Sequence, residues 1–248
     1  MQKIVAYILT PLFFIAFGIT LLIFHPIQWV CLNIFGYSAH KKSVDFLNFF
    51  LCRCTNILGT WYTFDNQFDI PVSQPVIIIA NHQSLYDIPP IIWYMRKHHP
   101  KFISKKELGR GIPSVSYNLR HGGSALIDRK DPKQAIPALK EFALNVKEYN
   151  RSAVIFPEGT RSRNGVPKKF AVNGLKVLFK NIPNALVVPI TINNSWKMLQ
   201  YGKFPMGIGA HLIFKVHQPM PITTEDHDEF IEKIEEIITQ EVHTTNSS

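Results

Sequence analysis

Short apolar runs alternate along the chain with longer stretches in which apolar residues recur every three to four positions. Such short runs predict strands, and the longer stretches predict helices. The predicted strands cover residues 75–80, 101–104, 123–128, 152–156, 185–192 and 211–217. The predicted helices cover residues 84–97, 132–149, 170–180 and 225–240. This alternation predicts an α/β domain with a mixed, largely parallel sheet that is flanked by helices.

The most continuous apolar stretch lies near the start of the chain. Residues 4–24 contain no charged side chain over 21 positions, which is enough for a helix to cross a hydrocarbon layer of about 30 Å. Pro11 and Gly18 interrupt this stretch, and a second apolar run over residues 27–35 begins directly after Pro26. Because proline kinks helices, these breaks favour a bent helical hairpin in one membrane leaflet over a single span.

The chain therefore divides into three segments. We expect a hydrophobic, membrane-anchoring helical segment at residues 1–40, one catalytic domain at residues 41–242 and a flexible tail at residues 243–248. A chain of 248 residues with 46% hydrophobic content can bury one substantial core. A secretory signal explains the first segment less well, because its apolar run is longer than the usual signal core and no Ala-x-Ala site follows closely.

The net charge of +9 is unevenly distributed. Residues 96–180 contain 19 Lys and Arg against 6 Asp and Glu, whereas residues 225–241 contain 1 against 8. A basic region beside a membrane anchor is expected to lie against anionic headgroups and to attract substrates that carry phosphate. We expect no nucleic-acid partner, because the chain has no recognised nucleic-acid motif and that role leaves the apolar anchor unexplained.

The three cysteines, Cys31, Cys52 and Cys54, are too few and too irregularly spaced for a disulfide framework or a zinc site. This favours a reducing compartment. Together with the apolar segment, it leads us to expect a location at the membrane, on the cytoplasmic face of the inner (plasma) membrane. No metal site is expected, because the histidine and aspartate described next have no further His or Cys at ligand spacing.

A histidine and an aspartate follow the apolar run at residues 75–80. His82 and Asp87 lie five positions apart in the sequence Asn-His-Gln-Ser-Leu-Tyr-Asp. This spacing does not align two side chains on one helical face, and it suits a strand-to-helix corner that folds the carboxylate back beside the imidazole. An imidazole in this setting can accept a proton from a hydroxyl group, while the carboxylate fixes its tautomer.

A second corner follows the apolar run at residues 153–156. The sequence Phe-Pro-Glu-Gly-Thr-Arg-Ser-Arg occupies residues 156–163, where proline and glycine favour a turn. Arg161 and Arg163 offer planar guanidinium groups that suit a phosphate. The chain lacks Gly-x-Ser-x-Gly, the turn expected of a serine hydrolase, and Ser84 is better explained as a helix N-cap than as a nucleophile.

With these residues the sequence resembles the lysophosphatidate acyltransferase family, the 1-acyl-sn-glycerol-3-phosphate acyltransferases. Four blocks match in the family's order: residues 81–87, residues 123–129, residues 156–163 and residues 187–192. The resemblance covers residues 60 to 220 approximately, and the first and third blocks are highly specific together. It implies an α/β fold similar to that of the glycerolphosphate acyltransferases.

The resemblance implies that a fatty acyl group moves from acyl-CoA or acyl-carrier protein to the sn-2 hydroxyl of lysophosphatidate, giving phosphatidate. It implies His82 as the general base and Asp87 as its partner. The residues expected to bind the acceptor are Arg129, Glu158, Gly159, Thr160, Arg161 and Arg163. Lys105 and Lys106 are candidate contacts for the phosphate of the acceptor or of the thioester carrier, although a solvated helix start explains them at least as well. The acyl donor is a substrate, and no cofactor is expected.

Three other functions remain open at this point. The same chemistry on another lysophospholipid or lyso-lipid acceptor would need the same histidine and aspartate. A non-catalytic lipid-binding protein on this scaffold would have no need for either residue. A membrane-bound hydrolase would cleave the thioester without an acceptor. An assay without acceptor therefore distinguishes hydrolysis from acyl transfer. The sequence does not determine the oligomeric state.

Overall fold

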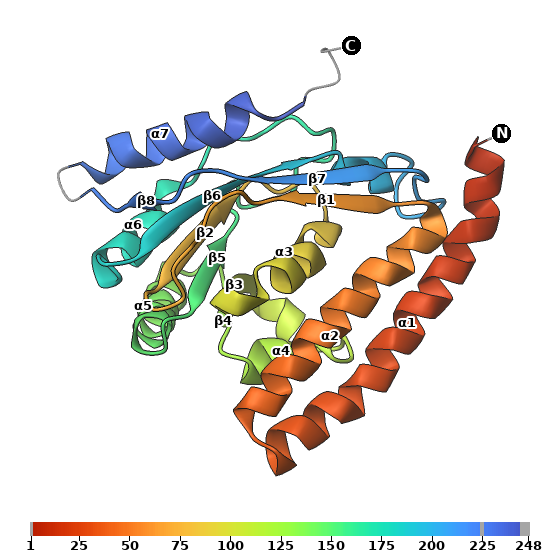
Figure 1. The fold of residues 1–248 in the computed structure, drawn as a ribbon, viewed down its shortest axis with the longest axis horizontal. Helices are drawn as coiled ribbons and strands as arrows, with labels where there is room; N and C mark the ends of the chain where they lie inside the picture. The colour runs from red at the N-terminus through yellow and green to blue at the C-terminus, as the bar shows by residue number, and fades with distance from the viewer. Residues whose placement is uncertain (1, 224–225, 244–248) are drawn as a thin grey trace.

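The computed structural model describes residues 2–223 and 226–243. Within these residues, eight strands form one sheet in the order β1-β7-β6-β2-β5-β3-β4, with β8 paired to β6 (Figure 1). The strands are β1 (Trp61–Asp65), β2 (Val76–Ala80), β3 (Pro100–Lys105), β4 (Ala125–Ile127), β5 (Ser152–Ile155), β6 (Leu186–Asn193), β7 (His211–Val216) and β8 (Met220–Pro221). Only the pairs β6–β7 and β6–β8 are antiparallel. The sheet is therefore mixed and largely parallel.

Helices cover both faces of this sheet (Figure 1). They are α1 (Gln2–Ile34), α2 (Tyr37–Thr55), α3 (Ile88–Tyr94), α4 (Val115–His121), α5 (Pro132–Glu148), α6 (Val172–Asn181) and α7 (His227–Gln240). On one face, α5, α6 and α7 bury an apolar cluster against Ile77 and Ile79 of β2. On the other face, α1, α2 and α3 pack over Ile78 and Ala80 of the same strand. Because both faces of β2 are covered, all five of its residues are apolar and buried.

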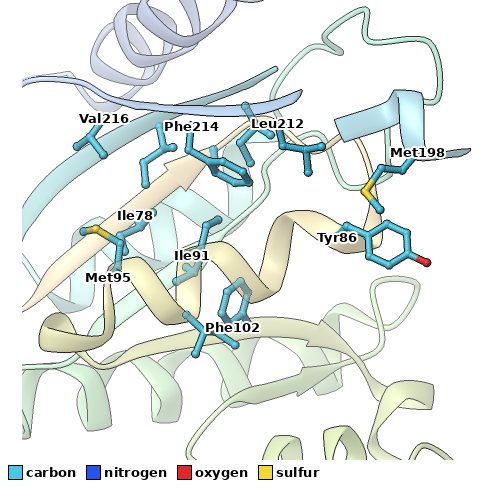
Figure 2. Packing of buried hydrophobic residues seen from close by; sticks show 14 of the residues in the cluster. Ile78, Tyr86, Ile91, Met95, Phe102, Met198, Leu212, Phe214 and Val216 are labelled. Atoms are coloured by element: carbon cyan, nitrogen blue, oxygen red, sulfur yellow. The ribbon is translucent and has the colours of Figure 1, made fainter. Parts of the chain in front are cut away.

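Helix α3 is the centre of the second apolar cluster. Figure 2 shows Ile91 of α3 lying between Phe102 of β3 and Phe214 of β7, and Met95, the residue that follows α3, near Ile78 of β2. Ile91 and Met95 are almost completely buried. This packing fixes α3 against the sheet, and α3 directly follows the corner that contains His82 and Asp87.

The structure confirms the predicted strands and adds elements that the pattern did not indicate. Apart from 3₁₀ turns, the missed elements are β1, α2, α4 and the short strand β8. β1 is an edge strand with partly exposed residues, and its sequence Trp-Tyr-Thr-Phe-Asp is no purely apolar run. The predicted helix at residues 84–97 is divided into the 3₁₀ turn η2 (Leu85–Asp87), α3 and the 3₁₀ turn η3 (Arg96–His98).

The hairpin that the breaks at Pro11, Gly18 and Pro26 favour does not form within residues 4–35. α1 is one helix that continues through Pro11 and Pro26, and the chain reverses at Gly36, whose φ of 83° suits glycine. α1 then packs along α2. A helical hairpin therefore does form, but its two arms are α1 and α2. A proline inside a helix lowers the stability of that helix by about 3 kcal/mol. The packing of α1 on α2 and on the domain offsets this loss. The boundary expected at residue 40 falls inside α2, and residues 244–248 of the expected tail lie outside the described residues.

One side of α1 packs on the domain while another side is exposed and apolar. Phe13 is fully buried against Tyr86, with ring centroids 5.8 Å apart, and Thr10 accepts a hydrogen bond from the backbone of Met206 at 3.0 Å. On the exposed side, Ile4 and Ile8 have 69% and 65% of their surface accessible. α1 is long and apolar enough to cross a membrane, which suggests that the chain associates with one.

The neighbours Phe13 and Phe14 give a matched test of this packing. Phe13→Ala should lower the free energy of unfolding by about 3–5 kcal/mol, because the substitution removes a buried aromatic ring. Phe14 is 43% exposed, so Phe14→Ala should have a much smaller effect. Thermal unfolding of both variants in the same detergent measures the difference. Equal melting temperatures for the two variants would contradict the packing of α1 on Tyr86.

Candidate functional site

The first part of the site is the corner that follows β2. The side chain of Asn81 pairs with the backbone of Ile192 in β6 through hydrogen bonds of 2.8 and 2.6 Å, so the end of β2 is fixed to its neighbour. Ser84 then caps the turn η2 by accepting the backbone N–H of Tyr86 at 3.0 Å. The structure thus confirms the predicted N-cap at Ser84, and this cap bends the chain toward α3.

His82 and Asp87 meet across this corner as the spacing predicts. Nδ1 of His82 lies 2.8 Å from Oδ2 of Asp87. The same oxygen accepts the backbone N–H groups of Gln83 at 2.8 Å and Ser84 at 2.9 Å. Asp87 has no exposed surface, and a carboxylate can be buried in this way because several donors surround it. The carboxylate therefore holds the imidazole in one orientation.

The other side of the imidazole is available for chemistry. The side chain of His82 is 16% exposed, and its ring stacks on Phe156, with centroids 4.1 Å apart and an interplanar angle of 14°. Among the described residues, none forms a hydrogen bond with Nε2 of His82. Stacking fixes the plane of the ring while Nε2 is left to accept a proton from a ligand.

The second part of the site is the loop after β5, and backbone hydrogen bonds join it to His82. Oε1 of Glu158 accepts the backbone N–H of His82 at 2.9 Å, and the backbone N–H of Ser162 donates to the carbonyl of His82 at 2.7 Å. Oε2 of Glu158 accepts the backbone N–H of Lys168 at 3.2 Å. Both backbone polar groups of His82 are therefore used to hold this loop.

Burial raises the pKa of Glu158 to about 7. The backbone donors at His82 and Lys168 oppose this rise because they stabilise the ionised form, while the nearby Asp87 adds to it. Glu158 is only 8% exposed. Its contacts place it in a structural position, between the backbone of His82 and the backbone of Lys168.

Arg129 joins a third segment to the same loop. Its guanidinium donates to the carbonyl of Gly159, whose φ of 69° is a conformation that favours glycine. Nζ of Lys168 holds the next residues, donating to Oγ1 of Thr160 at 2.8 Å and to the carbonyl of Arg161 at 3.0 Å. The three predicted segments, after β2, β4 and β5, thus lie together at the carboxyl ends of parallel strands.

The basic residues differ in how closely they contact the segments after β2, β4 and β5. Arg161 lies near the catalytic corner: burial raises the pKa of the Tyr86 phenol, and the Arg161 guanidinium opposes that rise. Arg161 and Arg163 are both exposed. Lys105 ends β3 and Lys106 begins the 3₁₀ turn η4 (Lys106–Gly109), and both are exposed. In the part of the chain that the structure describes, no hydrogen bond ties Arg163, Lys105 or Lys106 to the other site residues.

Several residues of the site had no signal in the sequence analysis. Ser195, in the 3₁₀ turn η5 (Ser195–Leu199) after β6, donates a hydrogen bond to Oδ1 of Asp87. Phe156 was part of the matched loop, but its stacking on His82 was not predicted. Lys168 was likewise not expected to brace the loop at Thr160. Among the described residues, no group of three or more His, Cys, Asp or Glu side chains is arranged to hold a metal ion.

This geometry can serve a class of protein in which a histidine, oriented by a buried carboxylate, accepts a proton beside a loop with exposed guanidinium groups. The model of the Acyltransferase family matches residues 62–193, which is just over half of the chain. This stretch contains His82, Asp87 and the loop at residues 156–163. The chain therefore belongs to this acyltransferase family.

Two relatives support the assignment to the acyltransferase family. The chain is 37% identical over 133 residues to a 1-acyl-sn-glycerol-3-phosphate acyltransferase of Helicobacter pylori, over 50% of this chain and 54% of that protein. It is 30% identical over 169 residues to the protein of the same name in Saccharomyces cerevisiae, over 65% of this chain and 53% of the relative. The chain thus spans about half the length of these curated relatives.

The fold also matches a solved structure along nearly its whole length. The crystal structure of the 1-acyl-sn-glycerophosphate acyltransferase PlsC from Thermotoga maritima superimposes with a TM-score of 0.75 at 24% sequence identity. The superposition covers 97% of this chain and 95% of that one. At this level of identity the likeness establishes the fold.

The raised pKa of Glu158 predicts a pH-dependent stability. In the unfolded chain this carboxyl group ionises with the ordinary pKa of 4.5, whereas in the folded chain it keeps its proton up to about pH 7. The folded state therefore binds more protons between these values, and stability falls as pH rises through this window and levels off above it. Glu158→Gln does not titrate. The melting temperature of the wild type minus that of Glu158→Gln should decrease from pH 5 to pH 7.5.

Glu141→Gln on the exposed side of α5 is the control, and its difference from the wild type should not follow this trend. A difference for Glu158→Gln that increases with pH would show that the backbone donors at His82 and Lys168 outweigh the burial of the carboxylate.

Proposed function

We propose that the chain transfers a fatty acyl group from a thioester carrier to the sn-2 hydroxyl of lysophosphatidate, which gives phosphatidate for phospholipid synthesis. The observation that carries this proposal is the hydrogen bond of 2.8 Å between His82 and Asp87, beside the guanidinium groups of the loop at residues 156–163. The names of the relatives from Helicobacter pylori and Saccharomyces cerevisiae support the choice of acceptor.

The proposed reaction proceeds in one displacement through a tetrahedral intermediate. Nε2 of His82 removes the proton of the sn-2 hydroxyl as its oxygen attacks the thioester carbonyl carbon. The carbon–sulfur bond then breaks, and the imidazolium returns the proton to the leaving thiolate. Asp87 stabilises the imidazolium while it exists. No acyl-enzyme is required, and Ser84 is poorly placed to form one, because it is fully buried and its hydroxyl is bonded to Ser195.

In this proposal the acceptor phosphate lies on the basic side of the site. Arg161 and Arg163 are exposed and can form paired hydrogen bonds to phosphate oxygens. Glu158, Gly159, Thr160 and Arg129 hold the loop that presents them. Lys105 and Lys106, at the end of the parallel strand β3, add positive charge to the same edge of the sheet. These exposed cations favour a phosphate-bearing acceptor over a neutral one.

The acyl donor in this proposal is acyl-CoA or acyl-carrier protein. A thioester already carries a good leaving group, so the proposed transfer needs no cofactor beyond the two substrates. The chemistry at His82 is the same for both carriers, because each presents the same thioester carbon. Donor choice is therefore a question of which carrier surface docks beside the site.

We further propose that α1 lies within one membrane leaflet, on the cytoplasmic face. α1 touches the rest of the fold along its length: Thr10 bonds Met206, the carbonyl of Leu21 accepts the hydroxyl of Ser114 at 2.6 Å, and Asn33 bonds Tyr117 at 3.0 Å. A helix held in this way cannot stand across a bilayer without carrying the polar domain into it. Its exposed apolar side suits an orientation along the membrane plane.

His82→Ala should reduce acyl transfer on the order of a thousandfold or more, because a general base contributes about 10² to 10⁴ in rate. Purified protein in phospholipid–detergent micelles is given labelled acyl-CoA or acyl-carrier protein with a panel of lysolipids. His243→Ala, outside the site, is the matched control. Near-normal turnover by His82→Ala would refute its role as base, and release of fatty acid without an acceptor would identify a hydrolase instead.

Arg161→Ala should raise the KM for lysophosphatidate roughly tenfold or more while kcat changes little, because it removes a charged contact to the phosphate. Lys233→Ala removes a positive charge from the exposed side of α7 and should leave KM unchanged. The measurement is initial rate against the mole fraction of lysophosphatidate, with monoacylglycerol as an acceptor that lacks phosphate. An unchanged KM in Arg161→Ala would exclude a major role in phosphate binding.

A further inference from the structure

Asp87 receives hydrogen bonds on both carboxylate oxygens, and one donor comes from outside the catalytic corner. Oδ2 faces His82 and the backbone of Gln83 and Ser84. Oδ1 receives a close hydrogen bond from the hydroxyl of Ser195, which lies 108 positions further along the chain, whereas Oγ of Ser84 is 3.4 Å away. Ser195 is therefore the main donor to the carboxylate oxygen that does not contact the imidazole.

The hydroxyl groups of Ser84 and Ser195 form a directed chain that ends on Asp87. The two oxygens are hydrogen-bonded to each other, and Oγ of Ser84 also accepts the backbone N–H of Tyr86. Because Ser195 gives its proton to Asp87, Ser84 gives its proton to Ser195. Ser84, Asp87 and Ser195 have no exposed surface. Burial strengthens each of these bonds, and the loss of one donor leaves an acceptor that water cannot readily reach.

Backbone contacts hold Ser195 in this place. Its N–H donates to Oε1 of Gln83 at 3.0 Å. Asn194 before it adopts a left-handed conformation with φ of 66°, which turns the chain out of β6. Two residues before Asn194, Ile192 is paired with Asn81. The end of β6 is thus tied to the catalytic corner on both sides, and the position of the hydroxyl is set by the fold.

We propose that Ser195 is a positioning residue for the acyl transfer, whose hydroxyl orients the carboxylate of Asp87 so that Oδ2 stays directed at Nδ1 of His82. The proposal rests on the proposed function. Without the Ser195 donor, the negative charge of the carboxylate is less well stabilised. Asp87 then attracts protons more strongly, and the coupled pair of His82 and Asp87 gives up its proton at a higher pH.

The test compares Ser195→Ala with Ser195→Thr, which keeps the hydroxyl. Ser195→Ala should lower kcat about tenfold or more, in line with the loss of a hydrogen bond to a charged group. The KM for lysophosphatidate should stay the same, because Ser195 does not touch the acceptor loop. The acid limb of the pH–rate profile should move to higher pH. Ser195→Thr should restore most of kcat and the wild-type acid limb.

Ser43→Ala is the matched control, because Ser43 is also a buried serine whose hydroxyl donates to a backbone carbonyl, that of His40 at 2.7 Å. It should lower thermal stability by a similar amount while the pH–rate profile keeps its wild-type position. A wild-type kcat and acid limb in Ser195→Ala would overturn the proposal. An equal shift of the acid limb in Ser43→Ala would do the same, since it would reveal a general effect of lost stability.

A second measurement does not depend on activity. The titration of the His82 imidazole is followed by ¹⁵N NMR of the histidine-labelled protein and assigned by its absence in His82→Gln. Its midpoint should lie at higher pH in Ser195→Ala than in the wild type, and identical midpoints would overturn the proposal. If the wild-type chain transfers no acyl group to any lysolipid, the proposed function fails, while this titration still decides whether Ser195 acts on Asp87 and His82.

Discussion

Burying the carboxylate of Asp87 is the constraint on which the rest of the site depends. A charge without exposed surface is tolerated only where hydrogen-bond donors replace the lost water. These donors come from the imidazole of His82, from the backbone of the corner itself and from Ser195 after β6. The corner must therefore be sharp, β2 and β6 must be adjacent, and the side chain of Asn81 must hold their ends in register.

The second organising feature is the use of the His82 backbone. Its N–H and its carbonyl both bind the loop after β5, so the residue that we propose as the base also anchors the segment that carries Arg161. Asp87 and Ser195, which orient the imidazole, are buried and hydrogen-bonded to each other. The guanidinium groups of Arg161 and Arg163 are exposed. Rigid positioning suits proton transfer, which depends on geometry, and long exposed cations suit the capture of a flexible lipid headgroup.

Sequence patterns predicted the parts of this arrangement that depend on short segments. The central strands β2 and β5 are continuous apolar runs, and the residues after them carry distinctive chemistry, so the strands, the corner and the loop were all located. Ser195 was not, because it reaches Asp87 only through the pairing of β2 with β6, more than a hundred residues apart in sequence. Its own surroundings, Asn-Asn-Ser-Trp, are typical of an ordinary turn.

The errors in the remaining fold have a similar origin. Proline favours a kink locally, but α1 stays helical through Pro11 and Pro26, since α2 and the domain support it from one side. α2 combines polar and apolar residues in nearly equal measure, so its pattern does not stand out from a loop. Among the described residues, the edge strand β1 pairs only with β7, and it therefore needs no apolar run. Each element is determined by partners that are distant in the sequence.

The contact of Phe13 and Phe17 with Tyr86 brings the apolar helix directly behind the catalytic corner. In the proposed function, if the exposed side of α1 rests among acyl chains, the lysolipid acceptor and the product can reach and leave His82 by lateral diffusion, without crossing bulk water. Turnover would then follow the two-dimensional density of lysolipid in the bilayer, and dilution of the suspension at constant lipid composition would leave the rate per enzyme unchanged.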